Sequence, residues 1–379
     1  MSTSETIRDL LDPRELPLRH RLGVVALGIL ALAPLWSRLL YAGGQDLLLL
    51  RTLTAALFLG MFAMSWDAVS GYTGQISFGH AVFFGVGGYS SALLNLGYGI
   101  PPGFAIVGGT VFAGLAGLVI GVPSLRLEGP YLSLVTLVAP IILLRVFVFR
   151  SDVFGGELGL PSPDPLVPTS GFEQATIVFF YVAFFTFLVI LGVLLAVTRS
   201  DTGSVFTAIR EDEDAVSAAG LNPAKFKIFA FLLSATTGGL AGAVFVHTIG
   251  KPTPSELLVT TVSIEVIIAA VLGGMGTIVG AAVGGIFLSL FRSYLSDVTA
   301  TIPIVGIPIG HLDLLLFAVG TLLLLFYLPG GMVRWAVVAG KRRLADRKPA
   351  ATDGGQTPIR QVAATWRRSI ARLRGADDE

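Results

Sequence analysis

The sequence contains no cysteine, which excludes disulfide bonds, thiol catalysis and thiolate metal sites. Charge is also scarce: charged residues make up 13% of the 379 positions, hydrophobic residues make up 53%, and the mean hydropathy is +0.78. A water-soluble domain of this size would carry more charge on its surface. The formal net charge of +1 gives no sign of a nucleic-acid partner, and none is expected. The composition therefore indicates a membrane protein.

Motifs for enzyme chemistry are missing as well. The sequence has no G-x-x-x-x-G-K-S/T phosphate loop, no H-E-x-x-H and no G-x-S-x-G, and its four histidines are scattered. The chain is therefore not expected to be an enzyme or to hold a cofactor or metal. If its work is driven by ATP, another subunit must supply the ATPase.

What the sequence does contain is a series of long apolar runs. They extend over roughly 17 to 25 residues, the length at which an α-helix crosses a bilayer. The runs do not alternate with a period of two, which excludes a transmembrane β-barrel. We predict an all-α, polytopic transmembrane bundle of about ten spans. The predicted spans are about Leu22 to Leu40, Leu47 to Trp66, Phe78 to Leu96, Gly103 to Val122, Leu132 to Phe149, Thr176 to Val197, Phe226 to Thr248, Leu258 to Leu272, Ile278 to Leu295 and Leu312 to Leu328.

Basic residues set the expected orientation, because cytoplasmic segments carry the excess of lysine and arginine. The arginine-rich tail 334–379 is predicted to be cytoplasmic, and an even number of spans then places residues 1–21 in the cytoplasm too. The transmembrane domain covers 22–333 of a protein of the plasma (inner) membrane, with the loop 199–225 inside and the loop 150–173 outside. The tail is expected either to lie on membrane lipids as a basic helix or to be merely solvated.

Two glycine-dense stretches interrupt the apolar pattern, Ser70 to Tyr89 and Leu272 to Gly285. We predict broken helices at both, as in transporters built from internal repeats. The alternative is close helix packing through small residues, which suits Gly280 and Gly284. The pattern leaves open whether a repeat would be parallel or inverted. The predicted helix-break glycines are Gly71, Gly74, Gly79, Gly273, Gly274 and Gly276.

Polar side chains accompany both stretches. Gln75, Ser77 and His80 lie in the first, and Ser263 and Glu265 precede the second. A charge inside the bilayer costs at least about 2.5 kcal/mol, which makes Glu265 a functional candidate. We predict that these residues line a translocation path. The alternative for Glu265 is an interhelical hydrogen bond to a backbone or serine group.

Other ionisable residues are expected to be interfacial. Asp67 and His247 fall near the ends of predicted spans, where solvation is cheap, and neither is given a role in the path. No chain of intramembrane acids or histidines suggests a proton relay, which weakens the case for a proton-driven carrier.

A charged, alanine-rich amphipathic stretch, Thr207 to Ala230, separates two of the apolar runs. Such a segment has a function in a membrane protein if a soluble partner binds to it and thereby moves the transmembrane part. The stretch is therefore predicted to be a docking surface, which indicates an energy-coupled permease.

Taken together, these stretches resemble the membrane subunits of bacterial and archaeal ABC importers of the branched-chain amino acid type, the LivM/LivH permease family. The resemblance covers most of the chain. It rests on G-Y-T-G-Q-I-S-F-G-H from Gly71, L-R-L-E-G-P-Y-L-S-L from Leu125, A-I-R-E-D-E-D-A-V-S-A-A-G-L-N-P from Ala208, S-I-E-V-I-I-A-A-V-L-G-G-M-G-T from Ser263, and L-P-G-G-M from Leu328.

The resemblance implies a permease that works by alternating access with partner proteins. These are ATP-binding cassette subunits, a second, similar permease subunit, and an extracytoplasmic solute-binding protein. In such a permease the charged loop carries a short coupling helix that fits a groove on the ATPase. That role falls here on Arg210, Glu211, Glu213, Asp214, Ala215 and Gly220.

Three alternatives are weighed against this interpretation. Permeases for urea or short amides share the pattern, so the solute is predicted as a branched-chain amino acid with those solutes as the alternative. A stand-alone secondary transporter is disfavoured by the charged loop. A membrane-embedded enzyme would need a convergent polar cluster that the spans do not show.

Overall fold

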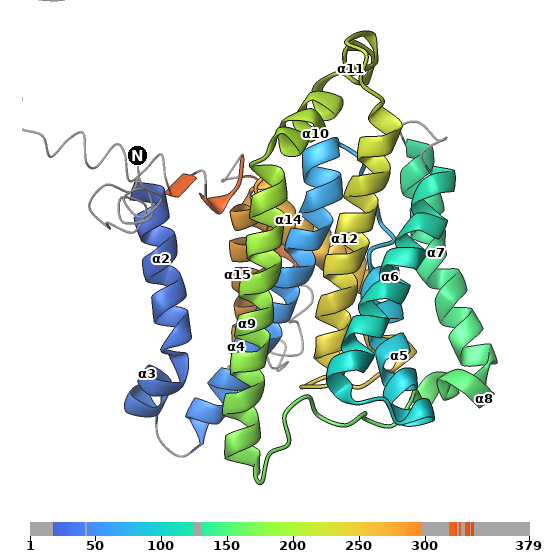
Figure 1. Cartoon of the computed structure of the whole chain (residues 1–379). Coiled ribbons are helices and arrows are strands. Elements are labelled where there is room, and N and C mark those ends of the chain that lie inside the picture. Colours follow the sequence, from blue (N-terminus) through green and yellow to red (C-terminus); the bar gives the residue numbers. More distant parts are fainter. Residues whose placement is uncertain are drawn as a thin grey trace, which may run out of the picture. The chain divides into compact units, whose positions relative to one another are not determined.

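The computed structural model describes residues 18–41, 44–124 and 130–296, together with short pieces at 318–323, 326, 330–333 and 335–336. Every regular element in these ranges is helical, which confirms the all-α prediction (Figure 1). The described residues up to Trp335 belong to one compact unit. The predicted N-terminal segment, the last predicted span and the basic tail lie wholly or mostly outside the described ranges.

Helices of membrane-spanning length dominate the described part of the chain. Seven are long and apolar enough to cross a bilayer: Gln45–Gly71, Pro102–Pro123, Tyr131–Phe149, Phe172–Thr198, Pro223–Val246, Pro254–Gly274 and Ile278–Ser296. An eighth is possible if a bent pair near the N-terminus counts as one span. The predicted span at Phe78 to Leu96 is a helix as well, α5 (Ala81–Tyr98), although it is not one of these seven.

The elements follow one another with few long connections. In chain order they are α2 (Leu18–Ala31), α3 (Ala33–Leu40), α4 (Gln45–Trp66), the π-helical turn η1 (Asp67–Gly71), α5 (Ala81–Tyr98), α6 (Pro102–Ser124), α7 (Pro130–Phe149), α8 (Ser151–Phe154), η2 (Gly156–Leu158), α9 (Phe172–Thr198), α10 (Asp201–Glu211), α11 (Glu213–Ala218), α12 (Pro223–Val246), α13 (Pro254–Leu257), α14 (Thr260–Gly274) and α15 (Ile278–Ser296).

The first predicted span is not one straight helix. α2 and α3 meet at Leu32 with a bend of 63°. Pro34 lies in the first turn of α3, where it cannot donate a backbone hydrogen bond to the preceding turn. The continuous helix predicted for Leu22 to Leu40 is therefore corrected to a bent pair.

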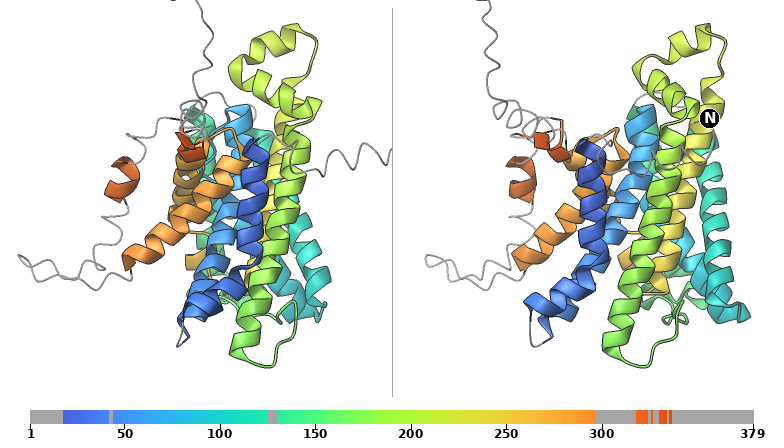
Figure 2. Two further views of the ribbon diagram at one scale, coloured as in Figure 1. Left: turned by 90° about the vertical axis from the view of Figure 1, so that its left-hand side faces the viewer. Right: turned by 60° about the vertical axis from the view of Figure 1, so that its left-hand side comes forward.

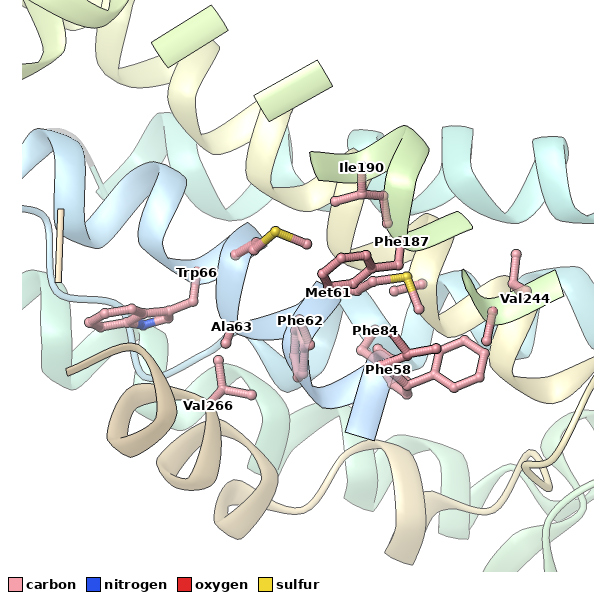
Figure 3. Packing of buried hydrophobic residues seen from close by; sticks show 14 of the residues in the cluster. Phe58, Met61, Phe62, Ala63, Trp66, Phe84, Phe187, Ile190, Val244 and Val266 are labelled. Atoms are coloured by element: carbon pink, nitrogen blue, oxygen red, sulfur yellow. The ribbon is translucent and has the colours of Figure 1, made fainter. Parts of the chain in front are cut away.

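α4 forms the centre of the bundle. Met61, Phe62 and Trp66 of this helix are almost completely buried. Figure 3 shows Phe187 and Ile190 of α9, Val244 of α12 and Val266 of α14 gathered around the same stretch of α4. A helix that is apolar on all sides can be enclosed in this way by its neighbours.

Small residues let the helices approach closely. A Cβ atom on Gly285 of α15 would stand 2.6 Å from the Cα of Gly60 in α4, and one on Gly284 would stand 2.0 Å from the carbonyl oxygen of Ala269 in α14. This is the packing expected of small residues between membrane helices. For Gly280 and Gly284 the packing interpretation is therefore the correct one, since Gly280 likewise lies against the carbonyl oxygens of Gly273 and Gly274.

Candidate functional site

The first glycine-dense stretch breaks a helix, as predicted. α4 continues through η1 to Gly71, after which residues 74–80 have no helical structure until α5 begins at Ala81. Non-helical backbone at membrane depth is tolerated only where the protein satisfies its polar groups. Side chains from neighbouring elements supply those partners here.

The hydrogen bonds to this segment come from four helical elements. Thr136 Oγ1 of α7 accepts from the Phe78 N–H at 3.1 Å, and Ser263 Oγ of α14 accepts from the Ala81 N–H at 3.0 Å. Trp66 Nε1 of α4 donates to the Ser77 carbonyl at 2.7 Å, and Ser70 Oγ of η1 accepts from the Ser77 N–H at 3.2 Å. The break is thus a built feature that α4, η1, α7 and α14 hold in place.

A buried polar chain lies next to the break. Ser234 Oγ donates to the Ser65 carbonyl at 2.6 Å and lies 2.5 Å from His80 Nε2. Because the serine proton is used on the carbonyl, His80 Nε2 is assigned as the donor to Ser234 Oγ. This chain ties α12 to α4 and to the residue that precedes α5.

The two glycine-dense stretches meet each other. Asp67 Oδ1 accepts a hydrogen bond from the Gly276 N–H at 2.7 Å, and a Cβ atom on Gly71 would stand 2.7 Å from the Gly276 nitrogen. Asp67 is fully buried. The expectation that Asp67 is solvated cheaply at a span end is wrong, because the turn after α14 covers the end of α4.

Arg210 links the charged loop to this junction. Its Nη1 donates to the Gly71 carbonyl at 2.9 Å, and Nη2 donates to Glu211 at 2.8 Å. The Cβ position of Gly276 is 2.7 Å from Arg210 Nη1, and that of Gly74 is 3.0 Å from Arg210 Cγ. One guanidinium side chain therefore lies against glycines of both stretches.

The charged loop folds as two helices rather than one. α10 ends with Arg210 and Glu211, and α11 carries Glu213, Asp214 and Ala215. These two helices project at one end of the bundle (Figures 1 and 2). The predicted single coupling helix is thus corrected: its six candidate residues are divided between the end of α10, α11 and the turn that follows.

Local signals explain why α11 begins and ends where it does. Asp212 Oδ1 accepts from the Ala215 N–H at 2.9 Å, which caps the start of the helix. Gly220, with φ +85°, ends the turn after α11, since other residues rarely adopt that conformation. Asn222 then caps α12, accepting from the Lys225 N–H at 3.4 Å. Lys227 of α12 forms an ion pair with Glu213 and so fixes α11 to the bundle.

Glu265 is paired within the protein. Its carboxylate accepts a hydrogen bond from Arg292 of α15. The alternative predicted for Glu265 was an interhelical hydrogen bond to a backbone or serine group. The bond is interhelical, but the prediction of its partner is wrong, because the partner is Arg292. Arg292 was not among the predicted residues. Its position inside the predicted span Ile278 to Leu295 was nevertheless a signal, because an ionisable residue within a span is a functional candidate.

A polar network anchors the loop 150–173, which lies at the end of the bundle opposite α10 and α11 (Figure 1). His247 Nδ1 lies 2.6 Å from the Asp164 carbonyl and therefore donates to it, which leaves Nε2 to accept from Ser91 Oγ at 2.8 Å. Asn95 Oδ1 accepts from the Asp164 N–H at 2.8 Å. His247 is 1% exposed, so its predicted interfacial placement is wrong. The loop is a fixed part of the fold at this point.

The predicted path residues therefore occupy two different places. Ser77, His80 and Ser263 are buried and hold the broken segment, and Gln75 is half-buried within it. Glu265 instead lines a cavity with Arg292 between α4, α14 and α15. No group of three or more potential metal-ligating residues is found in the described ranges.

A multi-span helical bundle with broken helices and a projecting charged loop defines a membrane transport protein of the permease class. The comparisons with known proteins specify it further. Residues 48–328 match the family model described as the branched-chain amino acid transport system permease component, and the chain belongs to this family. The family is one of transport subunits of ABC transporters, not of enzymes.

Two permease proteins of similar sequence agree with this assignment. The LivM permease protein of high-affinity branched-chain amino acid transport from Escherichia coli (strain K12) is 29% identical over 303 residues, covering 74% of this chain and 69% of LivM. The LivH permease protein of that strain is 25% identical over 293 residues, covering 72% of this chain and 90% of LivH. A solved chain described as an inward-facing metal-chelate type ABC transporter aligns with 81% of this chain and 98% of its own, with 16% identity and a TM-score of 0.46.

Membership of this family carries two consequences. The chain is a multi-pass protein of the inner membrane, and it works with partner subunits that include an ATPase.

Proposed function

We propose that this chain is a permease subunit of an ATP-driven importer of branched-chain amino acids and that it forms part of the solute path by alternating access. Family membership and the names of the similar proteins support the class. The observation that carries the mechanism is Arg210, which connects the end of α10 to the Gly71 carbonyl. A displacement of the charged loop would act directly on the junction of the two glycine-dense stretches.

The ATPase is proposed to bind the exposed face of α11. Asp214 and Ala215 are exposed there, while Val216 is buried and anchors the helix. Glu213 contributes by its ion pair with Lys227, which makes α11 move with α12. Gly220 forms the turn between them. In this arrangement Arg210 and Glu211 transmit the movement and α11 receives it.

The remaining partners follow from the two ends of the bundle. α10 and α11 face the cytoplasm in this proposal, as do both termini, and the anchored loop around Asp164 faces outward. A solute-binding protein would dock on that outer end. A second permease subunit would complete the path, and lipids would cover the apolar faces of helices such as α7, where Ile142 is 58% exposed.

The broken segment is proposed to be the part of the path that changes shape. Ser77, His80 and Ser263 keep it in the conformation seen here, and Gln75 presents an amide at its start. The segment's hydrogen bonds come from side chains on α4, η1, α7 and α14, so a shift of any of these helices alters its backbone. Alternating access needs such a bistable element.

Two other functions compete with this proposal. A permease for urea or short amides would have the same fold, and the solute distinguishes it. A stand-alone secondary transporter would have no use for an ATPase-docking helix, and the capped, projecting α11 disfavours it.

The test is to purify the tagged chain from its native membrane in mild detergent, identify what stays bound by mass spectrometry, and reconstitute that complex in liposomes with its binding protein. We expect ATP-binding subunits, a second permease, and ATP-dependent uptake of leucine. Uptake of urea in place of leucine would establish the alternative solute. A chain that emerges alone and transports without ATP would overturn the importer proposal.

A further inference from the structure

A cavity of about 460 Å³ lies between α4, α14 and α15. This volume falls within the range of about 300 to 1,000 Å³ that is usual for small-molecule sites. Its walls follow α4 from Thr52 to Phe62 and α15 from Leu288 to Ser296. The cavity therefore passes from one end of the bundle toward the broken segment before α5.

The inner end of the cavity is aromatic. Phe84 packs on Phe62 with ring centroids 4.9 Å apart and on Phe245 at 5.3 Å, and Phe58 meets Phe245 edge-on at 5.2 Å. Figure 3 shows Phe58, Phe62 and Phe84 close together. Phe62 also lies 6.0 Å from the His80 ring, at the broken segment. Such a wall favours an apolar group of a ligand.

The other part of the cavity is charged. Glu265 and Arg292 form an ion pair on its wall, and Glu256 of α13 lines it too. The side chains of Glu265 and Arg292 are 26% and 45% exposed, so neither is sealed inside the protein. Charges within a membrane span are costly and are typically kept for function.

These two parts are complementary to one kind of molecule. Glu256 and Glu265 offer carboxylates to an ammonium group, and Arg292 offers a guanidinium that matches a carboxylate in a bidentate manner. A zwitterion bound along the ion pair would set opposite charges side by side. The aromatic wall would receive an apolar side chain. Urea is neutral and lacks an apolar part, so it matches neither the ion pair nor the aromatic wall.

We infer that this cavity is a solute-binding site for amino acids with apolar side chains, in which Glu265 and Arg292 recognise the ammonium and carboxylate groups and Phe58, Phe62, Phe84 and Phe245 receive the side chain. The inference rests on the proposed function as an importer permease. Beyond that function, it assigns to the permease itself a site that recognises both the charged groups and the side chain of the solute.

The absence of cysteine makes the site directly testable. Ser293 lines the cavity, so Ser293→Cys places a single thiol in it. The variant is assembled with its partner subunits, reconstituted in liposomes, and labelled with a thiosulfonate reagent in the presence of L-leucine. The comparison compounds are leucinamide, which lacks the carboxylate, 4-methylpentanoate, which lacks the ammonium group, and urea.

Leucine is expected to slow the labelling of Ser293→Cys, while the three comparison compounds do so only at concentrations about tenfold higher or more. Ser170→Cys, in the exposed loop before α9, is the control and should label at one rate throughout. Equal protection by leucine and 4-methylpentanoate would show that the ammonium group is not recognised and would overturn the assignment of Glu265.

Charge variants supply the second measurement. Glu265→Gln combined with Arg292→Gln removes both members of this ion pair together, so that neither is left without the other. Gel filtration of the assembled complex establishes that this variant folds. Leucine should then protect the thiol at least about tenfold less well, while Arg292→Lys retains part of the effect. Undiminished protection in the double variant would overturn the inference.

Failure of the site and failure of the proposed function give different results. ATP-dependent leucine uptake without protection of Ser293→Cys would overturn the site and leave the importer in place. Protection by leucine in a complex that shows no ATP-dependent uptake would support the site and overturn the importer. ATP-dependent uptake of urea, with protection by neither compound, would overturn both the site and the amino-acid solute.

Discussion

Asp67 Oδ1 accepts a hydrogen bond from the backbone N–H of Gly276 at 2.7 Å, across 209 positions of the sequence. This bond joins the end of α4 to the turn between α14 and α15. Arg210 reaches the same place from α10 and donates to the Gly71 carbonyl. Both glycine-dense stretches and the charged loop therefore converge on one junction, on which the first three predictions depend.

The bond itself can be tested at Asp67. Asp67→Ala should lower the free energy of unfolding by about 1 to 3 kcal/mol, because the Gly276 N–H loses its acceptor. Asp67→Asn keeps an acceptor oxygen and should cost less. Thermal unfolding of the detergent-purified chain, followed by its tryptophan fluorescence, gives the comparison. Equal losses in the two variants would show that the acceptor is not what Asp67 contributes.

Close approach at Gly71 gives a second prediction. A Cβ atom there would stand 1.9 Å from Asp67 Oδ1, so Gly71→Ala must displace Asp67 or the Gly276 turn. The yield of folded protein in gel filtration should fall severalfold. Gly192→Ala on α9 is the matched control, since no heavy atom lies within 4 Å of its Cβ position. A Gly71→Ala variant as well folded as this control contradicts the close approach.

Arg210 should be needed for coupling rather than for folding. Arg210→Ala removes a charged hydrogen bond to Gly71, and ATP-dependent uptake by the reconstituted importer should fall about tenfold or more while the ATPase still binds. Arg210→Lys, which keeps one charged donor, should retain part of the uptake. Loss of ATPase binding in Arg210→Ala would instead place Arg210 in the docking surface.

The anchored loop provides a prediction at the other end of the bundle. His247→Ala removes two hydrogen bonds, to the Asp164 carbonyl and from Ser91, whereas Ser91→Ala removes one. Cleavage by a glutamyl endopeptidase at Glu157, an exposed residue in the same loop, should become faster in His247→Ala than in Ser91→Ala. Cleavage at the wild-type rate in both would mean that this network does not hold the loop.

Much of the fold was predictable because it depends on local properties of the chain. Apolar runs located the membrane helices, since backbone groups in lipid must be satisfied within the segment. The start of α12 at Asn222 and Pro223 and the turn at Gly220 follow from capping rules. Pro34 was a sequence signal for the bend between α2 and α3.

Contacts between residues on different helices were harder to predict from the sequence. Glu265 was recognised as costly in the membrane, but nothing near it in sequence identifies Arg292, 27 positions away, as its partner. Asp67 and His247 were misplaced for the same reason. Proximity to a span end implies solvation only if no other element covers that end.

The sequence by itself therefore determined the class of protein: the helices, the broken stretches, the charged loop and the family. Only the tertiary structure decided that Asp67, Gly71, Arg210 and Gly276 form one junction and that Glu265 and Arg292 share a cavity with an aromatic wall. The physical reason is one of range. Helix formation and capping act within a few residues, whereas these sites arise from helices distant in the chain that only packing brings together.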